Sequence, residues 1–112
     1  MAAVGKLIYG DTTVTIELDD RTLAHLQIVI SAKLRRGEGF FLSWNDPASV
    51  GDGRGSVWLD SSIPLYFRFR KSDRGELNRD WLEDLSIAAN HPQGLRLTEE
   101  PGALVTRGRS VP

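Results

Sequence analysis

The residues best suited to chemistry in this sequence are aromatic and basic side chains that recur close together. The predicted set consists of Tyr66, Arg68, Arg70, Arg35, Arg36 and Arg54. The first three occupy alternate positions of one short segment, so in a β-strand they would share a face. Aromatic rings interleaved with arginines on an open sheet can stack bases and pair with phosphates. The alternative interpretation is the solvated face of an antiparallel sheet with basic residues at a helix end.

Two loop patterns resemble ligand sites only in part. Gly51–Gly55 is rich in glycine, but it leads into a strand rather than a helix, which favours a hairpin loop over a phosphate site. A calcium loop through Asn45, Asp46 and Asp52 lacks the required ligand spacing. We therefore predict a plain loop over 45–55.

Histidines and paired carboxylates offer no complete catalytic set. His25 lies within a helical pattern, and we predict a helix-surface histidine at the edge of the core rather than a general base or metal ligand. His91 lies in a separate loop. The adjacent pairs Asp19–Asp20 and Glu83–Asp84 point apart on a helix and suit capping or surface roles. The sequence thus predicts no catalytic residue, cofactor or metal site.

The element around which the others are arranged is a helix over 19–37. Asp19 or Asp20 can cap its first turn, and Gly37 can close it in the left-handed conformation. Cations gather in the last turn, where they suit the helix dipole. The apolar stripe comprises Leu23, Leu26, Ile30 and Leu34, widened by Ile28, Val29 and Ala32. So wide a stripe indicates burial under a sheet and against either the second helix or another copy of itself.

Strands are expected both before and after that helix in the chain. Alternating or short apolar runs predict them at 6–9, 13–18, 40–44, 56–59, 65–70 and 95–97. Asn78 can cap a second helix, which Asn90 and Pro92 end. We predict an α+β domain over 5–98, with a mainly antiparallel sheet (β-β-α-β-β-(β)-α-β) and two helices packed on one face. Residues 99–112 are expected to form a loosely ordered tail.

The expected core follows from these periods. It comprises Leu7, Ile16, Leu18, Leu23, Leu26, Ile30, Leu42, Trp58, Leu65, Phe67, Trp81 and Leu85.

Composition narrows the functional classes. The 112 residues include 40% hydrophobic and 26% charged residues, as in an ordinary globular domain. A net charge of −1 argues against bulk attraction to nucleic acid or to an anionic membrane, although a local basic patch is compatible with it. No cysteine is present, and no 18 apolar residues run together. We expect a cytoplasmic protein without membrane partners.

Several segments resemble an uncharacterised family of short actinobacterial proteins that are often labelled ATP-dependent DNA ligase. They include GKLIYG, FFLSW and SVWLDSSIPLYFRF, and the resemblance spans nearly all of 5–98. The label implies a lysine that is adenylated within a Lys-x-Asp-Gly motif. Lys71 and Asp73 match that motif, but Arg74 replaces its glycine, and the chain is too short for the other ligase motifs.

The function expected from these observations is a small non-catalytic binding or assembly module. It would act through protein contacts of an apolar helix or sheet surface, with a homodimer as the simplest form. The alternative is an accessory domain that binds nucleic acid weakly and without sequence preference. Ligase activity is a remote third alternative.

Overall fold

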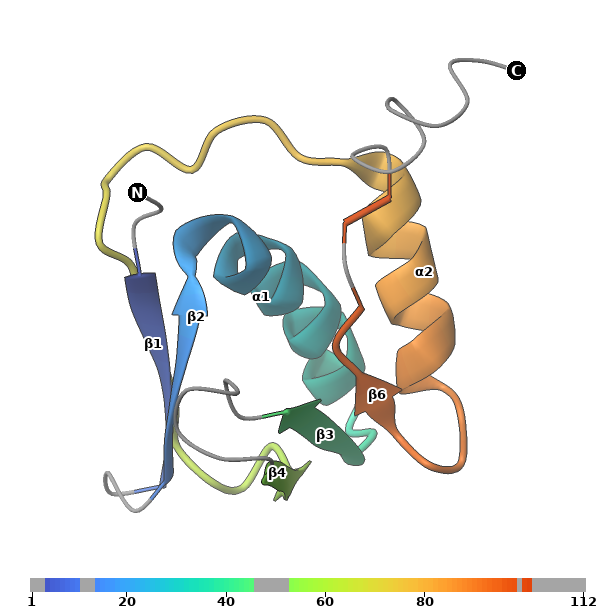
Figure 1. Ribbon diagram of the computed structural model, residues 1–112. Coiled ribbons are helices and arrows are strands. Elements are labelled where there is room, and N and C mark those ends of the chain that lie inside the picture. Colours follow the sequence, from blue (N-terminus) through green and yellow to red (C-terminus); the bar gives the residue numbers. More distant parts are fainter. Residues whose placement is uncertain (1–3, 11–13, 46–52, 99, 102–112) are drawn as a thin grey trace.

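The computed structural model describes residues 4–10, 14–45, 53–98 and 100–101. Its elements follow the predicted order, and the α+β class is confirmed (Figure 1). The elements are β1 (Val4–Tyr9), β2 (Val14–Asp19), α1 (Asp20–Arg35), β3 (Phe40–Asn45), β4 (Arg54–Leu59), β5 (Leu65–Arg68), α2 (Arg79–Ala89) and β6 (Leu95–Arg96).

The strands form two three-stranded sheets, where a single sheet was expected. Sheet A has the order β2-β1-β5 and sheet B the order β4-β3-β6. Every pairing is antiparallel except that of β6 with β3. The chain passes from sheet B to sheet A between β4 and β5, and β5 pairs with β1. Just before β5, the Pro64 carbonyl oxygen accepts from the N–H of Gly10, which follows β1, at 2.9 Å. Alternation along a strand fixes its faces but not its partner, so the sequence left this division open.

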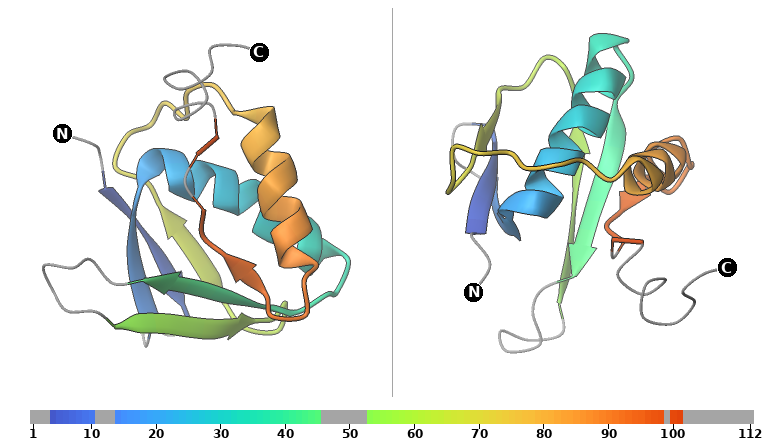
Figure 2. Two further views of the ribbon diagram at one scale, coloured as in Figure 1. Left: turned by 45° about the vertical axis from the view of Figure 1, so that its right-hand side comes forward. Right: turned by 90° about the horizontal axis from the view of Figure 1, so that it is seen from above.

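Each helix covers mainly one sheet. α1 packs against β1 and β2, α2 packs against β3 and β6, and the two helices pack against each other. Figure 1 shows α1 in the middle of the molecule, between sheet A and α2, and Figure 2 shows the same arrangement from two further sides. The expected second partner of α1 is therefore α2.

The ends of α1 carry the predicted signals. Asp19 is the N-cap, and its carboxylate accepts from Thr22 N–H at 3.4 Å and from the Thr22 hydroxyl at 2.6 Å. Gly37 follows the helix with φ of 75°. Asp20 has a different role, since its two carboxylate oxygens accept from the backbone N–H groups of Arg70 and Lys71. The first turn of α1 thereby holds the segment that follows β5.

α2 also begins where the sequence predicted. The side chain of Asn78 accepts from Trp81 N–H at 3.2 Å, and Trp81, Leu85 and Ala89 form the buried stripe. The helix turns this stripe toward α1, β3 and β6.

Most of the expected core is confirmed. Leu18, Leu65 and Phe67 are half-buried against it, and the prediction for Trp58 is wrong because this residue is exposed. Strand alternation explains the error, since Leu59 takes the inward position next to Trp58. The buried apolar residues that were not in the expected core are Ala24, Val29, Phe40, Leu59, Ala89 and Leu95.

None of the helices within the described ranges combines the length and the apolar character that crossing a membrane requires.

Candidate binding surfaces

The outer face of sheet A carries Tyr66 and Arg68 of β5, and Arg70 comes two residues after the strand, which ends at Arg68 instead of at the expected residue 70. Tyr66, Arg68 and Arg70 are exposed, and Tyr66 keeps 53% of its surface open. They alternate with the half-buried Leu65 and Phe67, as the strand period predicts. A long hydrogen bond of 3.5 Å runs from Arg68 Nη1 to the Tyr66 hydroxyl oxygen. The face that nucleic-acid binding requires is therefore open to solvent.

The other three predicted cations lie elsewhere. Arg35 lines a hollow together with Leu65, which belongs to the inner face of β5. Arg36 Nη2 forms an ion pair with Glu38 Oε1 at 3.3 Å. Arg54 begins β4 in sheet B. The structure thus brings together only half of the predicted set, because β5, the end of α1 and β4 belong to different parts of the fold.

A lysine outside the predicted set joins the outer face of sheet A. Lys6 of β1 is the cross-strand partner of Arg68 on one side and of Glu17 on the other. We call the exposed residues Lys6, Tyr66, Arg68 and Arg70 the Tyr66 face. Only the pairing of β1 with β5 puts Lys6 there, and no local pattern in the sequence indicates it.

The outer face of sheet B carries a second aromatic group that the sequence-based prediction did not include. Phe41 and Trp58 are cross-strand partners whose ring centroids lie 5.1 Å apart at an interplanar angle of 72°. Although they contact each other edge to face, Phe41 remains 43% exposed and Trp58 49% exposed. Alternation within 54–59 was the signal that could have placed Trp58 on the outside.

Arginines and serines surround this aromatic pair. The outward residues of sheet B that we call the Phe41–Trp58 face are Phe41, Ser43, Asn45, Arg54, Ser56, Trp58 and Arg96. The two serine hydroxyl oxygens lie 3.1 Å apart across the strands. No carboxylate belongs to this set. Asp60 comes next in the alternation, but it follows the strand and accepts from the Ser62 hydroxyl at 2.9 Å.

A hollow of about 490 Å³ adjoins the Phe41–Trp58 face. Its lining includes Arg54, Ser56, Arg96, His91 and Gln93, all of which can donate hydrogen bonds. This side of sheet B is therefore apolar at the aromatic pair and rich in donors and positive charge at Arg54 and Arg96.

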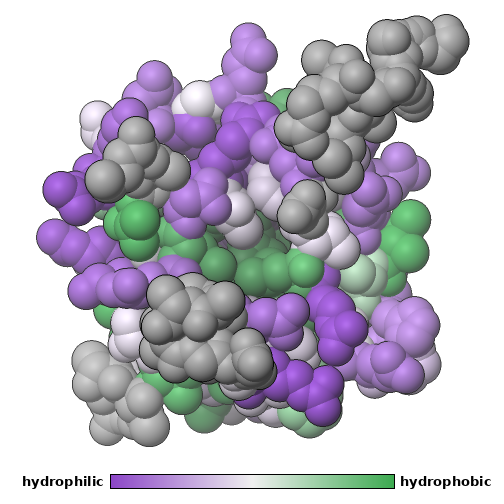
Figure 3. All heavy atoms as spheres, in the orientation of Figure 1, coloured by the Kyte–Doolittle hydropathy of each residue, from purple (hydrophilic) through white to green (hydrophobic). Residues whose placement is uncertain are grey.

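Apolar surface is exposed on other sides as well. In the orientation of Figure 1, hydrophobic residues form a band across the middle of the surface, between hydrophilic residues above and below (Figure 3). Ile87 of α2 is itself 64% exposed. Exposure alone therefore does not single out a site. What distinguishes the Phe41–Trp58 face is the combination of two touching aromatic rings with arginines on one sheet face.

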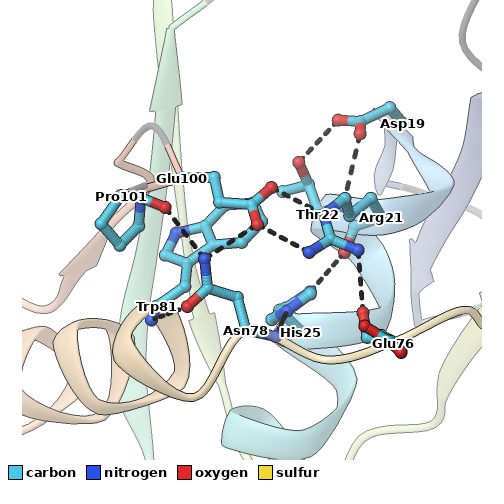
Figure 4. A network of polar contacts seen from close by, with 9 residues as sticks. All are labelled: Asp19, Arg21, Thr22, His25, Glu76, Asn78, Trp81, Glu100 and Pro101. Atoms are coloured by element: carbon cyan, nitrogen blue, oxygen red, sulfur yellow. Dashed lines mark hydrogen bonds and ion pairs between the residues drawn. The ribbon is translucent and has the colours of Figure 1, made fainter. Parts of the chain in front are cut away.

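His25 is buried, which corrects the expectation of a surface residue. Its Nδ1 lies 2.7 Å from the Arg21 carbonyl oxygen, and its Nε2 lies 2.8 Å from Asn78 N (Figure 4). A carbonyl only accepts and a backbone N–H only donates, so Nδ1 carries the proton and Nε2 accepts. The ring also packs on Trp81, with centroids 4.6 Å apart. His25 thus joins α1 to the start of α2.

The same junction includes Glu100. Its carboxylate accepts from Arg21 Nε and Nη2, both at 2.6 Å, and from Asn78 Nδ2 at 2.9 Å (Figure 4). The hydrogen bonds from the Arg21 guanidinium, and to a smaller extent the one from Asn78, lower the pKa of Glu100 to about 2. Arg21 also donates to the Glu76 carbonyl oxygen at 2.8 Å, which attaches the segment before α2. Residues 99 and 102–112 of the expected tail lie outside the described residues.

Lys33 belongs to the core rather than to a basic surface. It is buried, and its Nζ donates to Asn90 Oδ1 at 2.8 Å and lies 3.0 Å from Glu38 Oε1. The Lys33 ammonium, together with Arg36, lowers the pKa of Glu38. These contacts fasten the end of α1 to the end of α2.

The ligase-like Lys71 lies in an exposed turn. Its backbone N–H is held by Asp20, and Asp73 Oδ1 accepts from Gly75 N–H at 3.0 Å. Among the residues that the structure describes, no three His, Asp or Glu side chains gather in a group that could hold a metal ion. Asp46 and Asp52 of the calcium-loop pattern, and Gly51 of the glycine-rich loop, lie outside the described part.

The fold and its surfaces define a small α+β domain with two open sheet faces. The chain belongs to the family described as Domain of unknown function (DUF7882), whose family model matches residues 4–100. The match ends at Glu100, the residue that ties the end of the described chain to both helices. Comparisons with curated proteins and with solved structures found no match.

Proposed function

We propose that the protein is a non-catalytic module that binds another protein chain through the Phe41–Trp58 face. The observation that carries the proposal is the exposed pair of Phe41 and Trp58, in contact at 5.1 Å between ring centroids. Large aromatic side chains and arginines are enriched in protein interfaces, where they supply much of the binding energy. Covering both rings would remove apolar surface from water, which is the main driving force for association.

The edge-to-face contact favours a protein over a nucleic acid at this face. A ring whose face is met by the edge of its neighbour has less free surface for stacking a base. Trp58 also lies close over the backbone, since a Cβ at Gly39 would come within 2.6 Å of its Cζ2. Apolar side chains of a partner can pack around such a pair without needing a free ring face.

The test compares Trp58→Ala with Ile87→Ala, a matched truncation of another exposed apolar residue. Each tagged chain is used for affinity purification, and any protein retained by the native chain is then purified and titrated directly. We expect Trp58→Ala to weaken that binding about tenfold or more and Ile87→Ala to leave it nearly unchanged. If no purified protein binds in a manner that depends on Trp58, the proposal is wrong.

A second candidate is weak binding of single-stranded nucleic acid on the Tyr66 face. It is favoured by the exposure of Tyr66 and by Lys6, which adds a cation beside Arg68. Glu17 on the same side of the sheet counts against it. With about three or four phosphates contacted, log affinity should fall against log salt with a slope of roughly −2 to −4.

Three variants test this candidate by titration of a labelled oligonucleotide at several salt concentrations. Replacing Arg68 and Arg70 by alanine should flatten the slope, and Tyr66→Ala should weaken single strands more than duplexes. Arg79→Ala, an exposed arginine on α2, is the control. A slope equal in all variants would rule out the Tyr66 face.

Ligase activity, which the sequence resemblance implied, has its own test. Incubation with labelled ATP and magnesium would leave AMP on Lys71 if the lysine were the nucleophile. We expect no label on the native chain, since Arg74 replaces the glycine of the motif and Lys71 lies in an exposed turn. Label that disappears in Lys71→Ala would contradict the non-catalytic proposal.

A further inference from the structure

Within the described part of the chain, β4 is an edge strand with little to protect it from pairing. Among the described strands it is the outermost of sheet B, and β3 is its one partner. Its six residues contain no proline and a single charge, at Arg54. Figure 2 (left) shows β4 along the lower border of the molecule. Edge strands are usually blunted by proline, by inward charges or by a bulge, because their free N–H and C=O groups can pair with another chain.

The outward side chains of β4 are spaced evenly about Ser56 and can complement each other across a twofold axis there. Arg54 lies two residues before it and Trp58 two residues after it, and all three are exposed. In an antiparallel pair centred on Ser56, residue 54 of one strand stands opposite residue 58 of the other. Side chains directly opposite each other have Cβ atoms about 4.5–5.5 Å apart. At that distance the long Arg54 side chain can reach the part of the Trp58 indole that Phe41 and Gly39 leave exposed, which is about half of the residue, and a guanidinium beside an indole is a favourable contact.

We infer that β4 pairs antiparallel with β4 of a second copy of this chain, about a twofold axis at Ser56. The inference goes beyond the proposed function, because it concerns the free edge of sheet B rather than its outer face. The two copies of sheet B then form one continuous sheet. Arg54 faces the partner's Trp58 twice, and Ser56 faces the partner's Ser56 once.

Self-complementarity is what favours a second copy over an unrelated strand. A twofold interface must accept its own surface, and here each cation meets an aromatic ring instead of another cation. The small Ser56 at the axis allows the two strands to approach. Phe41, Ser43 and Arg96 of each copy take no part in the strand pairing, so these parts of both Phe41–Trp58 faces stay open on the outer side of the joined sheet.

The absence of cysteine from the chain allows a direct test. Ser56→Cys would bring two thiols to the twofold axis, close to the geometry of a disulfide. Ser86→Cys places a thiol on the exposed side of α2 and measures random collision. Under mild oxidation, we expect the Ser56→Cys chain to form covalent dimers at least about tenfold faster than Ser86→Cys on a non-reducing gel.

A second variant measures the equilibrium without any crosslink. Ser56→Lys sets two like charges opposite each other at the axis, while the exposed position leaves the fold intact. Light scattering at increasing concentration should show the native chain and Ser86→Lys dimerising, and Ser56→Lys remaining monomeric. The intact fold of Ser56→Lys is checked by its circular dichroism and urea midpoint.

Two results overturn the inference. One is a native chain that stays monomeric at high micromolar concentration while both cysteine variants oxidise at equal rates. The other is a dimer that persists in Ser56→Lys, which would place the interface on another surface. Neither result affects the proposed function, which stands or falls with the Trp58-dependent binding of a purified protein of different sequence. The two failures are therefore distinguishable.

Discussion

At the scale of residues, the polar junction around His25 shows how one buried side chain can join two helices. Both ring nitrogens are used, one on Arg21 of α1 and the other on Asn78 at the start of α2. A buried N–H that loses its acceptor costs about 1–3 kcal/mol, more than the net value of a typical hydrogen bond. His25 therefore has a structural role that its position in the sequence did not suggest.

His25→Ala is expected to lower the free energy of unfolding by about 2–4 kcal/mol. The change leaves a cavity beside Trp81 and removes the acceptor of Asn78 N–H. Urea denaturation monitored by circular dichroism measures the effect. His91→Ala, at an exposed position, is the matched control and should change stability by less than about 0.5 kcal/mol. Equal midpoints for the two variants would refute the assigned role.

Glu100 gives the junction a pH dependence that can be separated from that of the other carboxylates. Its pKa in the folded chain is about 2, below the ordinary value of 4.5. A lowered folded pKa means that the stabilisation is fully present above about pH 4.5 and is lost as pH falls toward 2. Glu100→Gln should therefore lower stability by about 1 kcal/mol at pH 7, with the difference from the native chain shrinking below pH 4.5. Urea midpoints at pH 7, 4 and 3 measure this, and a difference that is constant over that range would contradict it.

At the scale of elements, α1 is the helix that connects the parts of the core. It packs against sheet A and α2, and its buried residues belong to the same apolar cluster as those of sheet B. Its residues Leu23, Leu26 and Ile30 are completely buried in the same cluster as Leu7 of sheet A and Leu42 of sheet B. The two sheets are therefore coupled through one apolar core, and damage to α1 should be felt by the whole domain.

Leu26→Ala is expected to cost about 2–5 kcal/mol, because it leaves a cavity at a fully buried position of α1. The unfolding transition should stay single, since both sheets pack on the same core. Ile87→Ala on the exposed side of α2 is the control. Urea denaturation followed by both tryptophan fluorescence and circular dichroism measures the midpoint and tests whether the two signals coincide.

At the scale of the whole molecule, the end of the described chain returns to the beginning of α1. Glu100 contacts Arg21 and Asn78, and the Pro101 carbonyl oxygen accepts from Asn78 Nδ2 at 2.9 Å. Contacts with the two helices therefore reach beyond Thr98 to residues 100–101 of the expected tail.

Two truncations locate this boundary. A chain ending at Pro101 should unfold at the same urea concentration as the full chain, whereas a chain ending at Thr98 should be less stable by about 1–2 kcal/mol, because it loses the Arg21–Glu100 pair and the acceptors of Asn78. Equal stability of the two truncated chains would show that residues 99–101 contribute nothing.

The sequence by itself determined the elements of this protein and the faces of its strands. A helix cap depends on residues two or three positions away, so Asp19 and Asn78 could be recognised as N-caps from the sequence. The faces of a strand follow from alternate positions, so Tyr66 and Phe67 could be placed on opposite faces of β5. The alternation within β4 also predicts that Trp58 points outward, although the size and apolar character of tryptophan suggested a core position.

The tertiary structure alone decided which strands pair and hence which side chains meet. The pairing of β1 with β5 brings Lys6 to Arg68, and the pairing of β3 with β4 brings Phe41 to Trp58. It also separated Arg54 from Tyr66 and buried His25 between the helices. The physical reason is that strand partners are chosen by the packing of one shared core, in which residues distant in the chain compete for the same space, and no local pattern records the outcome of that competition.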